Sequence, residues 1–136
     1  MDLFTAMEVS SSGMQAQGRR LRVIAENIAN RDSLADSPGL DPYRRRMVTF
    51  RSVLDEATGA SKVEVDRVVP DRSEFALRFD PQHPAADENG YVKIPNVNTL
   101  VEMMDMREAQ RSYEANMNVV EAAKTMLRRT IELLRN

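Results

Sequence analysis

The sequence predicts an α+β fold in which long N- and C-terminal helices pair as a coiled-coil-like bundle, with a small β-rich segment between them in the chain. All six prolines fall between residues 38 and 95, so both ends are free of the strongest helix breaker. Both ends also repeat large apolar residues every seven positions, whereas the middle has short β-favouring runs. We therefore divide the chain into an N-terminal helix (1–30), a connector with a β-rich segment (31–97) and a C-terminal helix (98–136).

The N-terminal helix carries a stripe of large apolar residues with a period of seven, formed by Met7, Met14, Leu21 and Ile28. A single helix cannot bury such a stripe against itself, so the stripe predicts a partner helix in this chain or in another one. Small residues precede three of these positions by three residues: Ser11, Gly18 and Ala25. They would let a further helix approach closely, which favours an assembly of several helices over a lone hairpin.

Two asparagines stand near the end of this helix. Asn30 is expected to end it in a left-handed cap. Asn27 lies inside the helix, where asparagine has poor propensity, so we predict that its amide bonds to a neighbouring subunit and fixes the register between subunits.

The C-terminal helix is expected to begin with a capping box, Thr99 to Glu102, in which the hydroxyl and the carboxylate satisfy free backbone amides. Acidic residues stand near the start of the helix and arginines near its end, and charges in these positions interact favourably with the helix dipole. Its apolar seam predicts the partner of the N-terminal stripe and comprises Met103, Met106, Tyr113, Met117, Val120, Leu127, Ile131 and Leu134.

The middle segment contains four runs that favour β-strands: YRRRMVTF, SKVEVDRVV, EFALRF and GYVKI. Asn89-Gly90 is a hairpin-type turn signal just before the last run. Residues 30–41 are rich in turn-forming residues and predict an irregular connector.

Composition argues against several classes of protein. A net charge of −2 indicates neither nucleic acid nor an anionic membrane as a partner, and the absence of cysteine rules out a disulfide framework. No apolar run approaches the roughly 18 residues of a membrane span, and the first residues do not form a secretory signal.

The sequence offers no catalytic, cofactor or metal site. His83 is the single histidine, so it has no second imidazole or thiolate to complete a metal site, and we interpret it as a surface loop residue. Asp80, Asp87 and Glu88 lack the spacing of a calcium loop. The arginines at 44–46 could bind phosphates, but a solvated strand edge or a salt-bridge patch between subunits is the favoured interpretation.

Several motifs resemble the bacterial flagellar axial protein family. SSGMQAQGRRLRVIAENIAN is similar to the N-terminal signature of that family, which ends in Asn-x-Ala-Asn. DPYRRRMVTF and HPAADENGYVKIPNVN, with the helix that follows, resemble its proximal-rod members more narrowly, and the resemblance covers nearly the whole chain.

The resemblance implies a structural protein, not an enzyme: a subunit of the proximal rod that transmits torque from the membrane ring to the hook. It implies terminal helices in the inner wall of a hollow rod, an outward-projecting middle segment, and export through the flagellar type III route. The implied partners are other rod proteins, copies of the chain itself, and the membrane ring and export apparatus at the base. Another rod or hook paralogue, or a cytosolic coiled-coil adaptor, is the alternative.

The predicted assembly interface consists of the two apolar seams together with the two asparagines: Met7, Met14, Leu21, Asn27, Ile28, Asn30, Met103, Met106, Tyr113, Met117, Val120, Leu127, Ile131 and Leu134.

Overall fold

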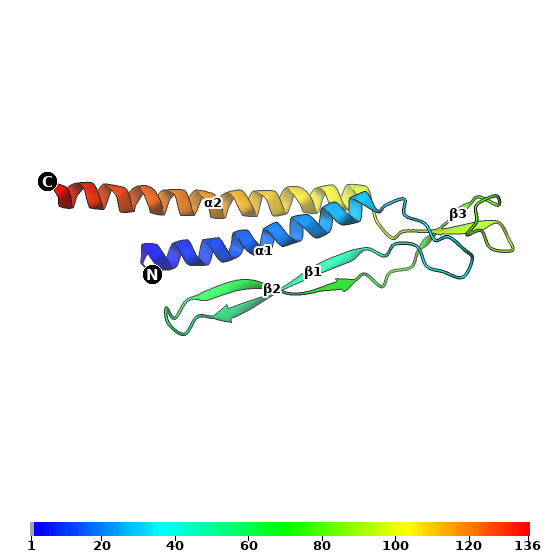
Figure 1. Cartoon of the computed structure of the whole chain (residues 1–136), viewed down its shortest axis with the longest axis horizontal. Coiled ribbons are helices and arrows are strands. Elements are labelled where there is room, and N and C mark those ends of the chain that lie inside the picture. Colours follow the sequence, from blue (N-terminus) through cyan, green and yellow to red (C-terminus); the bar gives the residue numbers. More distant parts are fainter. Residues whose placement is uncertain (1) are drawn as a thin grey trace.

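The computed structural model describes residues 2–136 and confirms the predicted α+β architecture. Two long helices run side by side in opposite directions, and two small antiparallel hairpins lie between them in the chain (Figure 1). In chain order, the elements are α1 (Leu3–Ala29), β1 (Arg46–Leu54), β2 (Ser61–Pro70), β3 (Ala76–Phe79), β4 (Tyr91–Ile94) and α2 (Thr99–Arg135).

Both helices begin at a side-chain cap. Asp2 accepts a hydrogen bond of 2.7 Å from the Thr5 backbone amide at the start of α1. At the start of α2 the cap is Asn98, whose side-chain oxygen accepts from the amides of Leu100 and Val101. The predicted capping box is therefore wrong, because Asn98 already satisfies these amides and Glu102 turns into the protein instead.

The two helices meet through small and polar side chains. On α2 the central positions of the contact are Glu102, Ala109, Asn116 and Ala123, spaced seven apart. On α1, Gly13 faces Asn116 so closely that an added Cβ would lie 2.6 Å from its amide nitrogen. Small residues at a contact let two helix axes approach each other.

The predicted stripes of large residues flank this contact instead of forming its centre. Along α1 the four stripe residues are half-buried, and along α2 the same is true of Met106, Tyr113, Val120 and Leu127. The other members of the α2 seam are exposed, with fractions of 54% for Met103, 40% for Met117, 51% for Ile131 and 82% for Leu134. The helices thus pair as predicted, but through a face displaced from the predicted seams.

Helix α2 is longer than α1, with 37 residues against 27. The antiparallel register sets Asn27 beside Glu102 and Gly13 beside Asn116, so Leu3 falls beside Met126. Residues 128–135 therefore extend past the N-terminus of α1, as Figure 1 shows at the red end of the chain. We call this segment, Arg128–Arg135, the overhang.

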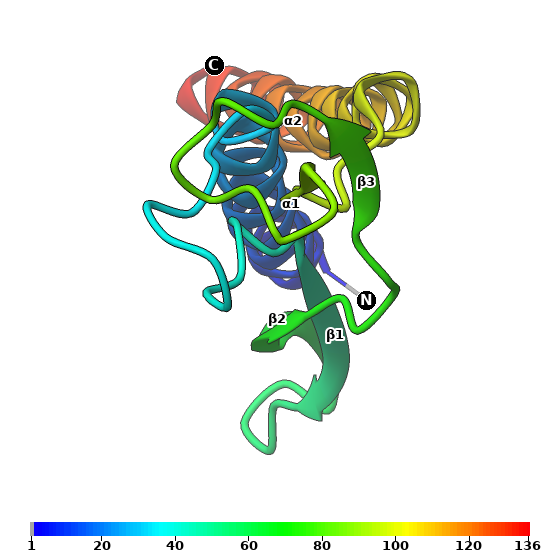
Figure 2. The ribbon, with the colours of Figure 1, turned by 90° about the vertical axis from the view of Figure 1, so that its right-hand side faces the viewer.

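The first hairpin lies along α1 on a different side from α2, so α1 forms the middle layer (Figures 1 and 2). Strands β1 and β2 pair from Arg46 with Pro70 to Leu54 with Ser61, with a bulge between Thr49 and Phe50. The Ser12 hydroxyl accepts a hydrogen bond of 3.3 Å from the Val63 amide and ties the hairpin to the helix.

The second hairpin, β3 with β4, lies beyond the opposite end of the helices from the overhang (Figure 1). The predicted Asn89-Gly90 turn is present, since Gly90 has φ 82° and its amide donates to the Asp87 carbonyl. It closes only the last part of a longer connection, residues 80–90, and is not a two-residue hairpin loop. Over residues 2–136, no helix has both the length and the apolar character needed to span a membrane.

Candidate functional site and assembly surface

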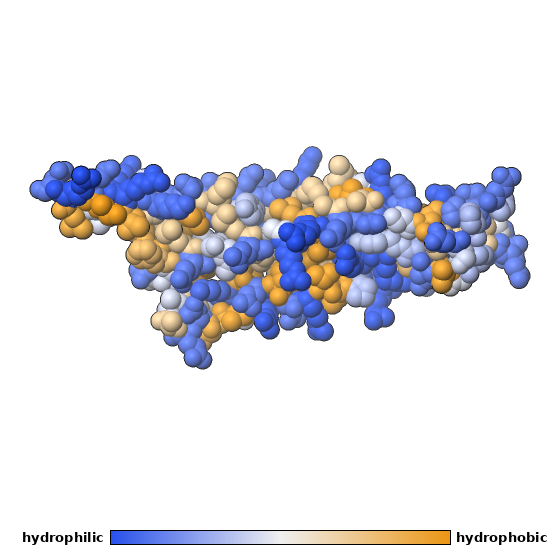
Figure 3. Space-filling model, in the orientation of Figure 1, coloured by the Kyte–Doolittle hydropathy of each residue, from blue (hydrophilic) through white to orange (hydrophobic). Residues whose placement is uncertain are grey.

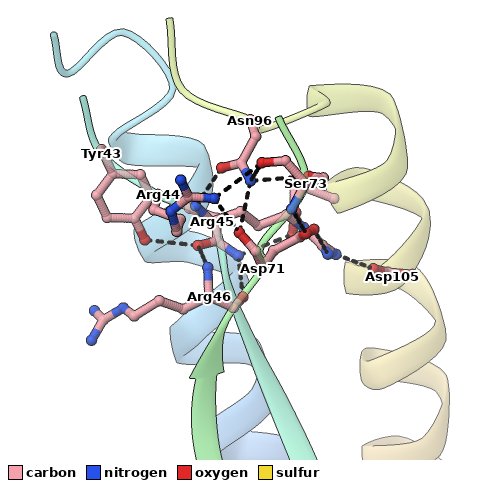
Figure 4. Close-up of polar contacts among 10 residues, drawn as sticks. Tyr43, Arg44, Arg45, Arg46, Asp71, Ser73, Asn96 and Asp105 are labelled. Atoms are coloured by element: carbon pink, nitrogen blue, oxygen red, sulfur yellow. Dashed lines mark hydrogen bonds and ion pairs between the residues drawn. The ribbon is translucent and has the colours of Figure 1, made fainter. Parts of the chain in front are cut away.

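A buried group of polar side chains lies where the end of α1, the start of β1 and the start of α2 converge. Glu102 is fully buried and Asn27 is 1% exposed, although both are polar. Burial of such groups is costly unless each is hydrogen-bonded, so their partners define the local structure. We call this group the polar cluster; it comprises Asn27, Tyr43, Arg45, Asp71, Asn96, Glu102 and Asp105. Figure 4 labels Tyr43, Arg45, Asp71, Asn96 and Asp105 of this cluster and shows their polar contacts.

Arg45 is the cation at the centre of the polar cluster. Its Nε donates to the Glu102 carboxylate, and its two terminal nitrogens donate to Asp71 at 3.1 Å and Asp105 at 3.3 Å. Burial by itself lowers the pKa of Arg45, but bonding to Glu102 and Asp71 outweighs it, so the pKa lies above its usual value. One guanidinium therefore joins the beginning of α2 to the segment after β2.

Asp71 is held in its charged form mainly by the backbone. The amide of Ser73 donates to its carboxylate at 2.9 Å, and this bond is the main reason that the pKa of Asp71 lies below its usual value. Burial works in the opposite direction, while the Ser73 side chain and Arg45 lower the pKa further.

Asn27 uses its whole side-chain amide inside its own chain. Its nitrogen donates to the Arg46 carbonyl at 2.8 Å and to Glu102 at 3.4 Å. Its oxygen accepts from the Tyr43 hydroxyl at 2.7 Å and from the Arg46 amide at 3.0 Å. The partner predicted in a neighbouring subunit is thus replaced by partners in the same subunit, because residues 43–46 return to α1 at this point.

Asn30 ends α1 without the predicted left-handed conformation, since its φ is −102°. Its side-chain nitrogen instead donates to the Glu26 carbonyl at 2.8 Å, and its oxygen accepts from the Ser33 hydroxyl at 2.9 Å. Both bonds satisfy groups at the helix end, so the helix stops without a strained cap.

Of the arginines at 44–46, Arg44 and Arg45 are bound within the chain, whereas Arg46 is exposed at the start of β1, as the solvated-edge interpretation predicted. The Arg44 guanidinium lies 4.2 Å from the centre of the Phe75 ring and donates to the carbonyls of Asp71 and Ser73. Arg46 pairs with Glu26 at 2.5 Å. The side chain of Asn96 completes this region by accepting from the Arg45 amide at 2.7 Å and donating to the Asp71 carbonyl.

The polar cluster has a positioning role, because it joins both helices to the segments that flank the first hairpin and to the segment between β4 and α2. Within residues 2–136, no three His, Cys, Asp or Glu side chains lie together in a way that could hold a metal ion. His83 lies in the loop between β3 and β4, half-buried, where its Nδ1 accepts a hydrogen bond of 3.0 Å from the Ala85 amide. Its role there is to shape the loop.

Sequence reasoning missed the pairing of Arg45 with Glu102. The sequence contained a signal for Glu102 only. Glu102 stands seven residues before Ala109, on the face of α2 that packs against α1, and a carboxylate buried there requires a partner. The identity of that partner was not visible, since Arg45 is 57 residues away in the chain.

Segments at both ends of the chain match families of flagellar rod proteins. Residues 7–32 match the family described as "Flagella basal body rod protein", and residues 88–133 match "Flagellar basal body rod FlgEFG protein C-terminal". The class of protein defined in this way is a structural component of the flagellar rod and not an enzyme.

Similarity to individual proteins extends over nearly the whole chain. A flagellar basal-body rod protein FlgC from Agrobacterium fabrum is 50% identical over 133 residues, which cover 98% of this chain and 96% of that protein. Proteins of the same name from Aquifex aeolicus (41% identical, 97% of each chain) and Salmonella typhimurium (38% identical, 98% of each chain) are also similar. The chain therefore belongs to the FlgC family of flagellar basal-body rod proteins. Membership of a rod-protein family implies assembly with other rod proteins.

Proposed function

We propose that this chain is a structural subunit of the proximal rod, the part of the flagellar drive shaft that carries torque from the membrane ring towards the hook. The observation that carries the proposal is 50% identity over nearly the full chain to a rod protein of the FlgC family. The shape supports it, because two long antiparallel helices leave large apolar side chains exposed along their length.

The mechanism is the formation of interfaces. Exposed apolar residues near the start of α2, among them Leu100 at 68% and Met104 at 64%, need a cover that the subunit itself does not supply. We include the predicted interface residues in this surface, apart from Asn27, which is buried inside the subunit. Many modest helix contacts, repeated around a tube, would produce a stiff shaft from small subunits.

The polar cluster gives each subunit a defined shape before it enters the shaft. By linking the ends of the first hairpin to both helices, it resists rotation of that hairpin relative to the helices when torque is applied. In this proposal the helices line the inner wall of the rod and the β-rich segment projects outward. The partners are copies of the chain, other rod proteins, and the ring and export apparatus at the base.

A pair of variants tests the structural role. Leu127 is half-buried at the last turn of α2 that has α1 beside it, so Leu127→Asp places a charge in the helix contact and is expected to abolish swimming by blocking rod assembly. The matched control His83→Ala removes one loop hydrogen bond and should leave swimming intact. Normal basal bodies in the Leu127→Asp strain would contradict the proposal, as would loss of swimming in the His83→Ala strain with normal assembly.

The proposed export route is tested separately. In cells with an inactive flagellar type III export apparatus, the chain should stay in the cytoplasm with its N-terminus uncleaved. Its appearance outside the cytoplasm in those cells would contradict this route.

A further inference from the structure

The second hairpin and the connector beside it expose an apolar surface at one end of the molecule. Phe79 lies opposite Tyr91 in the strand register, so these two side chains and that of Leu77 share one face of the hairpin. Leu40 of the connector lies with Leu77 and Tyr91 around a hollow of about 70 Å³. The exposed fractions of these four apolar residues run from 43% to 64%. We call this surface, residues 35–41 and 76–94, the hairpin end.

The hairpin end has negative charge that its own cations do not neutralise. It carries five acidic and two basic residues, with His83 counted as neutral. Both basic residues already have partners, because Lys93 pairs with Asp41 at 3.4 Å and Arg78 with Asp80 at 3.9 Å. The three remaining acidic residues are exposed and form no ion pair within residues 2–136: Asp36, Asp87 and Glu88. A partner with free cations would therefore be attracted to this end.

The overhang, at the other end of the molecule, is an apolar surface that lacks a cover in the subunit. Ile131 and Leu134 follow Leu127 at helical spacings of four and seven, so they continue the face of α2 that packs against α1. Within residues 2–136, α1 ends before it reaches them, and the exposed fractions are 78% for Leu133 and 82% for Leu134. Figure 3 shows apolar side chains along the edge of the overhang that faces the α1 side of the molecule.

Arginines border the apolar surface of the overhang on both sides. At about 100° per residue, Arg128 and Arg135 lie beside Ile131, and Arg129 lies beside Leu133. Three arginines against the single acid Glu132 give the overhang a net charge of +2. In the part of the chain that the structure describes, none of these four charged side chains forms an ion pair. The overhang thus presents apolar side chains together with free cations.

Charge separates the hairpin end from other surfaces that could receive the overhang. Two overhangs side by side would bring three arginines against three, which is repulsive. The hollow along the outer face of α1 is lined by Arg19, Arg22 and Lys62, and its two glutamates already have ion-pair partners. The hairpin end instead combines exposed apolar side chains with unpaired carboxylates.

The two surfaces cannot meet within one subunit. The hairpin end lies beyond the start of α2, and the overhang is the far end of the same helix (Figure 1). Helix α2 has 37 residues, so it holds the two surfaces about 55 Å apart. A second copy of the chain is needed to bring them together.

We propose that the hairpin end of one copy receives the overhang of a second copy, with Leu133 and Leu134 against the apolar face of the hairpin and the arginines facing Asp87 and Glu88. This inference rests on the proposed role as a rod subunit and specifies one of its contacts. Because the two surfaces differ, each added copy leaves one hairpin end and one overhang free. The contact therefore extends a row of copies that point the same way and does not close into a dimer.

Two complementary variants of the purified full chain test the contact. The overhang variant is Leu133→Ser, Leu134→Ser, and the hairpin variant is Leu77→Thr, Glu88→Arg. All four side chains are exposed, so both variants should unfold at the same urea concentration as the natural chain. In sedimentation at millimolar concentration, the natural chain should form a series of oligomers, whereas each variant by itself should stay monomeric. An equimolar mixture should form a dimer and nothing larger, because each variant keeps the end that the other has lost.

The charges are tested with the same measurement. Salt should weaken the association of the natural chain, because it screens attraction between exposed charges. Glu88→Arg by itself should weaken association about tenfold, since an attraction becomes a repulsion. The matched control is Arg107→Glu, which reverses an exposed charge on α2 outside both surfaces and should leave association unchanged.

The outcomes separate this contact from the broader function. Dimers of the hairpin variant by itself would overturn the proposal, because they would show that two overhangs meet. A natural chain that stays monomeric, or a mixture that forms no dimer, would also overturn it and would indicate that other rod proteins cover the two ends. None of these results contradicts the rod function, which the Leu127→Asp strain tests independently.

Discussion

Removal of Arg45 should destabilise the subunit far more than removal of a surface arginine. In Arg45→Met the carboxylate of Glu102 stays fully buried and keeps one side-chain donor, the Asn27 amide at 3.4 Å. Loss of one partner from a buried ion pair typically costs 3–5 kcal/mol. The Arg45 side chain is 17% exposed, so water reaches part of the site and we expect a loss of about 3 kcal/mol.

A double variant and a surface control define this value. Replacing both partners, Arg45→Met with Glu102→Leu, removes the stranded charge, and Asp71 and Asp105 are exposed enough to be solvated. The double variant should therefore recover most of the stability. Arg51→Met is the control, because its ion pair with Glu64 is exposed on both sides and should contribute at most about 1 kcal/mol.

Urea unfolding of the purified full chain, followed by far-ultraviolet circular dichroism, measures these free energies. The reasoning is refuted if Arg45→Met costs no more than Arg51→Met, or if the double variant is less stable than the single one. Either result would mean that the polar cluster is solvated and does not hold the first hairpin to the helices.

Three further predictions concern the same structure. The pKa of Asp71 is lower in the folded state than in the unfolded chain, so the charged carboxylate stabilises the fold above the unfolded pKa. This stabilisation is lost as the pH falls from about 4 through the folded pKa. Urea titrations over that pH range should therefore show a smaller loss of unfolding free energy in Asp71→Asn than in the natural chain. Gly18→Ala should stabilise the purified chain by about 1 kcal/mol. Gly13→Leu should destabilise it, because the added atoms collide with Asn116. Thermal unfolding of both variants measures the two effects, and equal shifts in unfolding temperature would contradict the prediction. Asn27→Leu should lower the stability of the isolated subunit by about 1–3 kcal/mol, because the Arg46 amide and the Tyr43 hydroxyl lose their acceptor; unchanged unfolding would show that water replaces the bonds.

The sequence alone determined the elements and their order. Proline positions and apolar periodicity placed the two helices to within a few residues of Leu3–Ala29 and Thr99–Arg135, and β-favouring runs located the strands. These features depend on local conformational preferences, which can be inferred from a few neighbouring residues. Motif resemblance similarly led to the family, since it too is a property of contiguous sequence.

Only the tertiary structure decided which faces meet and which polar groups pair. The large-residue stripe of α1 was the predicted contact face, but the face that carries Gly13 meets α2, because helices approach most closely over small side chains. From the local pattern, Glu102 was predicted to cap its helix and Asn27 to bond to a neighbouring subunit. Their real partners, Arg45 and residues 43–46, are brought in by the return of the chain after the connector. Burial and pairing of this kind depend on contacts between residues distant in sequence, and local patterns do not contain that information.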